Sequence, residues 1–208
     1  MSQIVVAQNI NGIALAAENR AVLLNEEGQE ITLQADRLLP LTSHTALLTA
    51  GSAEGIEMGH ALKKFVQEEG FTDVQDLYGA SLAFLSTEYE RFMRKKCELV
   101  PLDPLHHVSF ILAGKTAKDP AMPFRLYFLW TKKKLPQLDG EEISLAFSLP
   151  RRMGLEYQLN KLCREQGSPE QLLANIKEGM VHLRELGEVT SSVTYAIIND
   201  AGYQTMNI

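Results

Sequence analysis

The sequence lacks the features that mark membrane and secreted proteins. No apolar run approaches the ~20 residues that a membrane-spanning helix needs. Residues 1–6 have neither the basic start nor the long apolar stretch of a signal peptide. Cysteine is scarce, since only Cys97 and Cys163 are present, and they show no pairing or metal-binding spacing. We therefore expect a cytoplasmic protein with free thiols and no membrane span.

An excess of positive charge is also missing. Lys and Arg number 20 against 26 Asp and Glu, giving a net charge of −6. Because phosphate binding needs a basic face, we expect no nucleic-acid partner. The one basic run, residues 132–134, is typical of a solvated hairpin turn. Residues 51–55 lack the Lys-Ser/Thr of a phosphate-binding loop, and His106 and His107 fit a loop better than a metal site, so we expect no cofactor.

What is present fits a globular chain. Its 208 residues, of which 45% are apolar, are enough for one domain with a sizeable core. We found no internal repeat, low-complexity segment or linker, and therefore predict a single domain over residues 1–208.

Turn signals and hydrophobic periodicity predict an alternation of strand and helix blocks. Strands are expected at residues 4–8, 12–17, 31–33, 45–50, 108–113, 124–130, 143–147 and 192–198, with turns at Asn11-Gly12 and at 26–28. Helices are expected at residues 53–66, from an N-cap at Thr72 towards 96, at 151–166, and from a capping box that begins at Ser168. This order predicts two central sheets with helices on both outer faces.

The first part of the chain has a distinctive order of segments. Residues 2–8 (SQIVVAQ) precede a short turn and residues 12–20 (GIALAAENR), and residues 37–41 (RLLPL) and 46–55 (ALLTAGSAEG) follow. This order resembles the opening of proteasome β-subunits, which begin with a catalytic Thr, a strand, a turn and a second strand ending in an acidic residue followed by Arg. Matching of individual residues extends over about the first 55 positions.

The resemblance implies a fold and a chemistry. The implied fold is the N-terminal-nucleophile hydrolase fold, an α+β four-layer αββα sandwich of two antiparallel sheets flanked by helices. Removal of Met1 would expose Ser2 at the nucleophile position, with its own α-amine as base, since such an amine has a pKa of ~7.7–8.0. Glu18 matches the acidic residue that orients the basic member, and Gly51 matches the oxyanion-hole glycine.

The chain also departs from the family pattern. The catalytic Lys falls at Arg37, which holds positive charge but cannot give up its proton near neutrality. The family's Gly-Ser-Gly segment falls near residues 146–150, where Ser148 is the only candidate. Its late Asp should lie near residues 185–190, where the sequence has none.

Two functions consequently stay open. The first is a peptidase or amidohydrolase with Ser2, Glu18, Arg37 and Gly51 as its site, acting on a peptide or an unfolded protein, or on a small amide. The second is a catalytically inactive structural subunit. In either case the resemblance implies a homo-oligomeric ring, whereas the sequence says nothing about an ATPase partner.

Overall fold

The computed structural model describes residues 2–24, 29–97, 99 and 106–206. Its elements, in chain order, are β1 (Ile4–Asn9), β2 (Gly12–Glu18), β3 (Arg20–Leu24), β4 (Glu30–Gln34), β5 (Leu38–Thr42), β6 (Thr45–Gly51), α1 (Glu54–Glu69), α2 (Val74–Lys95), β7 (Val108–Lys115), β8 (Phe124–Thr131), β9 (Leu138–Ile143), β10 (Ala146–Leu149), α3 (Met153–Arg164), α4 (Pro169–Glu185), β11 (Val193–Asn199) and β12 (Gly202–Met206).

The strands form two five-stranded sheets and one short ribbon. One sheet has the order β10-β1-β2-β11-β12, the other the order β5-β6-β7-β8-β9, and β3 pairs only with β4. All the pairings are antiparallel. The prediction of an α+β chain built on antiparallel sheets is therefore confirmed.

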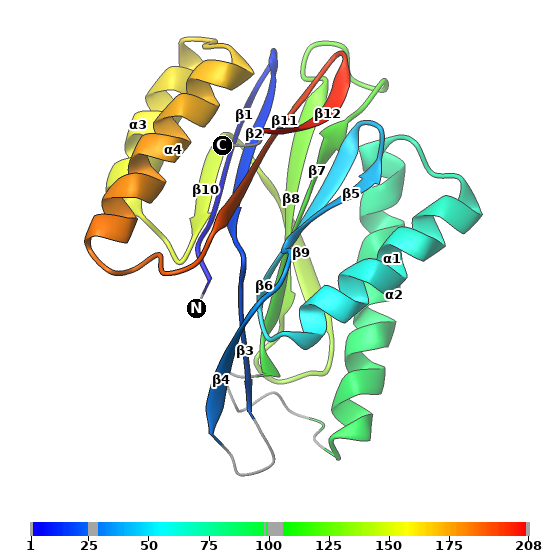
Figure 1. The fold of residues 1–208 in the computed structure, drawn as a ribbon. Helices are drawn as coiled ribbons and strands as arrows, with labels where there is room; N and C mark the ends of the chain where they lie inside the picture. Colours follow the sequence, from blue (N-terminus) through cyan, green and yellow to red (C-terminus); the bar gives the residue numbers. More distant parts are fainter. Residues whose placement is uncertain (1, 25–28, 98, 100–105, 207–208) are drawn as a thin grey trace.

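Side-chain alternation along the strands explains the layers. In β1, Ile4 and Val6 pack in the apolar cluster between the two large sheets, whereas Val5 and Ala7 pack against α3 and α4. A third cluster joins the other sheet to α1 and α2. The helix pairs thus cover the outer faces of the two stacked sheets (Figure 1).

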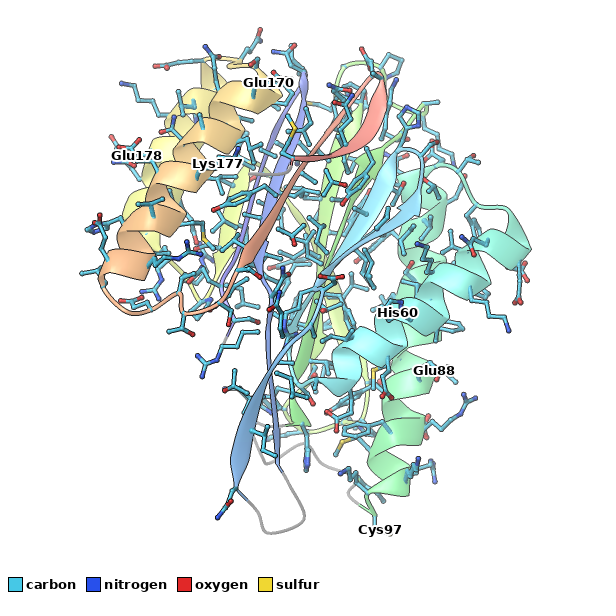
Figure 2. All side chains as sticks on the ribbon, in the orientation of Figure 1. His60, Glu88, Cys97, Glu170, Lys177 and Glu178 are labelled. Carbon is cyan, nitrogen blue, oxygen red and sulfur yellow. The ribbon has the colours of Figure 1, made fainter. Side chains whose placement is uncertain are left out.

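The outer faces of the helices carry exposed polar and charged residues. Glu170 and Glu178 on α4, and His60 on α1, are exposed and project away from the sheets (Figure 2). This one-sided pattern is the amphipathicity from which the helices were predicted. None of the helices in the described ranges is long and apolar enough to cross a membrane.

One strand prediction was wrong in an informative way. Residues 143–147 were expected to form a single strand, but β9 ends at Ile143 and β10 begins at Ala146, in the other sheet. Ile143 and Phe147 both line the cluster between the sheets, so their apolar pattern looks continuous. Gln8 fixes the crossing, because its Nε2 donates to the Ile143 carbonyl oxygen at 2.7 Å.

The remaining differences are smaller. The N-cap of α2 is Asp73 rather than Thr72, and its carboxylate accepts from the Gln75 amide at 2.9 Å. The capping box at Ser168 is confirmed. Strands β3, β5 and β12 were not predicted, nor was β9 before Ile143. The turn expected at 26–28 lies outside the described residues.

Candidate functional site

The β3–β4 ribbon explains how distant parts of the sequence meet. Glu18 ends β2 directly before the ribbon, and Arg37 stands directly before β5 after it, so the ribbon links the two large sheets. Its base is closed by the pairing of Arg20 with Gln34. Glu18 and Arg37 are therefore brought together, at the end of the sandwich where β1 begins (Figure 1).

Ser2 lies beside this junction. The start of β1 is adjacent to the end of β2, because a two-residue turn joins these antiparallel strands and pairs Ile4 with Ala17. The Ser2 side chain is buried, with 4% of its surface exposed. Its Oγ has no hydrogen-bond partner within the part of the chain that the structure describes. A buried hydroxyl without a partner is costly, so it needs an explanation.

Glu18 is fully buried, and its carboxylate binds three main-chain amides. Oε2 accepts from Gln3 at 3.0 Å, while Oε1 accepts from Thr190 at 2.8 Å and from Ser191 at 3.1 Å. Charge-assisted bonds of this kind stabilise a buried carboxylate. Glu18 consequently ties the residue after Ser2 to the segment that follows α4.

Arg37 is buried as well, and all three guanidinium nitrogens donate to carbonyl oxygens. Nε donates to Arg20 at 2.6 Å, Nη1 to Thr49 at 3.3 Å and Nη2 to Gly51 at 3.0 Å. Burial lowers the pKa of Arg37 to about 10, although the negative charge of Glu18 opposes this shift. The side chain is thus a fixed positive charge at neutral pH.

Gly51 occupies a position that only glycine fills without strain. Its φ of +82° lies in the left-handed region, and a Cβ would stand 2.2 Å from the His107 carbonyl oxygen. The bond from Arg37 fixes the orientation of its carbonyl. The structure therefore links Gly51 to Arg37 and brings Arg37 near Glu18, whose carboxylate binds the amide of the residue after Ser2. Their catalytic roles stay a prediction.

The two segments that departed from the family pattern are used differently. The hydroxyl of Ser148 donates to Glu156 Oε1 at 2.6 Å and accepts from the Arg152 amide at 2.6 Å. Glu156 also pairs with Arg151. Ser148 is thereby committed to the start of α3. Of residues 185–190, Thr190 reaches the site through its main-chain amide, which donates to Glu18 Oε1 at 2.8 Å.

Sequence reasoning missed two contributors, Gln3 and Arg152. The side chain of Gln3 is almost completely buried, and its Oε1 accepts from Arg152 Nε at 3.1 Å. A polar residue directly before a fully buried strand was the available signal. Arg152 gave none, because it stands in a basic pair at a helix start.

A cleft of about 570 Å³ lies between α3 and α4, with Arg152, Leu155 and Glu178 among the residues that line it.

Within residues 2–24, 29–97, 99 and 106–206, no three His, Cys, Asp or Glu side chains stand together as a metal site would require. Neither the protein-family models nor the curated proteins compared with this chain give a match.

Proposed function

We propose that this chain is a proteasome-like hydrolase of the N-terminal-nucleophile type, with Ser2 as its nucleophile once Met1 is removed. The observation that carries the proposal is the linked set of Glu18, Arg37 and Gly51 at the junction beside which Ser2 lies. Among the described residues, the buried Ser2 Oγ has no hydrogen-bond partner. The helix–sheet–sheet–helix layering supports the corresponding fold.

The proposed reaction is amide hydrolysis through an ester. The α-amine of Ser2 takes the proton from Oγ as Oγ bonds to the substrate carbonyl carbon. The N–H of Gly51 donates to the oxyanion that forms. The leaving amine departs with the proton, and water then hydrolyses the ester to release the acid and restore Ser2.

Arg37 supports this reaction as a charge and takes no part in proton transfer. Because it stays protonated, the α-amine of Ser2 carries the whole proton-transfer role. Its charge favours the neutral amine and stabilises a developing oxyanion. General acid–base catalysis supplies ~10²–10⁴ in rate, so losing a Lys from the relay predicts slow turnover.

The proposed substrate is a peptide or an unfolded protein, and the proposed assembly is a homo-oligomeric ring that encloses the site. Fluorogenic peptides test the activity, using protein whose intact mass shows that Met1 is absent. We expect slow cleavage that Ser2→Ala abolishes. Ser81→Ala is the matched control, since Ser81 is also buried with an unpartnered Oγ but lies on α2. Cleavage that survives Ser2→Ala would refute the proposal.

A second candidate is a catalytically inactive subunit of the same kind of assembly. It is favoured by Arg37, whose three nitrogens all bind carbonyls, and by Ser148, whose hydroxyl is engaged by Glu156. This candidate predicts no cleavage by the Met1-free protein but a ring in solution. Light scattering at micromolar concentration measures the assembly, and a strictly monomeric mass would count against both candidates.

A further inference from the structure

We propose that Arg152 is a positioning residue that holds Ser2 in place by hydrogen bonding to the side chain of its neighbour Gln3. This inference rests on the proposed function, because it assumes that Ser2 is the nucleophile. It concerns a residue 149 positions away from Gln3 in the sequence, at the N-cap of α3.

The side chain of Gln3 is bound at both ends of its amide. Oε1 accepts from Arg152 Nε at 3.1 Å. Nε2 donates to the carbonyl oxygens of Pro150 at 3.1 Å and Ile4 at 3.2 Å. Burying an amide is favourable only when such partners are present. A residue fixed in this way has little freedom to rotate.

The main chain of Gln3 is bound as well. Its amide donates to Glu18 Oε2 at 3.0 Å, and its carbonyl oxygen accepts from the Glu18 amide at 2.8 Å. All four polar groups of Gln3 are therefore engaged. Because Gln3 is fixed, the peptide bond that joins it to Ser2 is fixed as well. The orientation of this peptide sets the direction in which the Ser2 α-amine and hydroxyl point.

Arg152 closes these contacts into a ring. Its Nη2 forms an ion pair with Glu188, two residues before Thr190, and the Thr190 amide donates to Glu18 Oε1 at 2.8 Å. Glu18 in turn binds the Gln3 amide. The ring thus runs from Gln3 through Arg152, Glu188, Thr190 and Glu18 back to Gln3.

Arg152 suits this role because its fork of donors serves two partners at once. Nε binds Gln3, whereas Nη2 binds Glu188. Its own main chain is held by the bond from its amide to Ser148 Oγ at 2.6 Å. Arg152 also lines the cleft between α3 and α4, so it joins this cleft to the start of β1.

The test uses a peptide epoxyketone, which bonds to an amino-terminal hydroxyl and its α-amine. Loss of positioning should reduce the maximal labelling rate, kinact, and leave the half-saturating concentration, KI, unchanged. Because a misplacement of about 1 Å can cost ~10²-fold, we expect kinact to fall by about 10- to 100-fold in Arg152→Gln. Gln3→Met removes the other partner and should give a similar loss.

The double variant separates positioning from general weakening. If both residues act through their shared contact, the loss of kinact in Gln3→Met with Arg152→Gln, on a logarithmic scale, should be smaller than the sum of the two single losses. Arg125→Gln is the matched control, because Arg125 also binds two side chains at once, the carboxylates of Asp119 and Glu142, but from β8. It should retain wild-type kinact even where its Tm falls.

The outcomes distinguish this inference from the function on which it rests. No labelling of the Met1-free wild type would overturn both. Labelling of the wild type with an unchanged kinact in Arg152→Gln would overturn the role of Arg152 alone. Additive losses in the double variant, or an equal loss in Arg125→Gln, would likewise overturn it.

Discussion

Arg37 Nη2 donates to the carbonyl oxygen of Gly51 at 3.0 Å. The residue that stands where the resemblance to proteasome β-subunits implies a catalytic Lys is thus bonded directly to Gly51, the proposed oxyanion-hole donor. The guanidinium orders the main chain of the site and supplies charge beside it. Under the proposed function, Arg37 therefore acts through its charge and its hydrogen bonds, because an Arg cannot give up its proton near neutrality.

Arg37→Lys should raise activity and lower stability at once. A buried Lys can lose its proton near neutral pH, so we expect peptide turnover to rise by about tenfold, within the ~10²–10⁴ that acid–base catalysis offers. A Lys cannot satisfy all three carbonyls that Arg37 binds, and a buried unsatisfied carbonyl costs ~1–3 kcal/mol. Turnover assays and urea unfolding measure the two effects. An unchanged rate would remove Arg37 from the account of slow turnover.

Gly51→Ala should destabilise the protein far more than Gly70→Ala. Both glycines have a positive φ, of +82° and +71°, so both changes pay the left-handed penalty of ~1–2 kcal/mol. At Gly51 the added Cβ also meets the His107 carbonyl oxygen, whereas at Gly70 it meets nothing within 4 Å. The difference between the two variants in free energy of unfolding isolates the cost of the steric overlap with the His107 carbonyl oxygen. Equal losses would show that the close approach at Gly51 is not rigid.

Glu156 should make the free energy of unfolding depend on pH in the acidic range. Burial acts to raise the pKa of Glu156, but hydrogen bonds from Arg151 and Ser148 outweigh it and hold the pKa below the ordinary value of 4.5. A carboxylate with a depressed pKa contributes stability above its unfolded-state pKa and loses it as the pH falls through the folded-state value. Glu156→Gln should therefore cost most at neutral pH.

The measurement is the difference in unfolding free energy between wild type and Glu156→Gln as a function of pH. This difference should shrink as the pH falls below ~4.5. Glu178→Gln is the control, because Glu178 is exposed on α4 (Figure 2). A difference that stays constant down to pH 3 would contradict the assigned contacts.

The sequence predicted the parts of this molecule that depend on local chemistry. The hairpin of β1 and β2 followed from a turn signal, and it places the start of one strand beside the end of the other. The cap at Ser168 followed from its own four residues. The meeting of Glu18 with Arg37 was expected only from the resemblance, since the ribbon that causes it was not recognised as a unit.

The rest could not be predicted because it depends on contacts between distant segments. Gln3 and Arg152 are far apart in the sequence, and no sequence pattern links them. Thr190 and Ser191 bind Glu18 through main-chain amides, which every residue other than proline possesses. The crossing between β9 and β10 could not be seen in the sequence, because Ile143 before it and Phe147 after it both pack in the same apolar cluster.

The central claim is that Ser2, as an amino-terminal residue, is the nucleophile. Mass spectrometry of Met1-free protein treated with a peptide epoxyketone tests it most directly. The account predicts one added inhibitor mass per chain, located on Ser2 by peptide fragmentation, and absent from Ser2→Ala but retained in Ser81→Ala. An unmodified wild type, or an adduct on any residue other than Ser2, would contradict it.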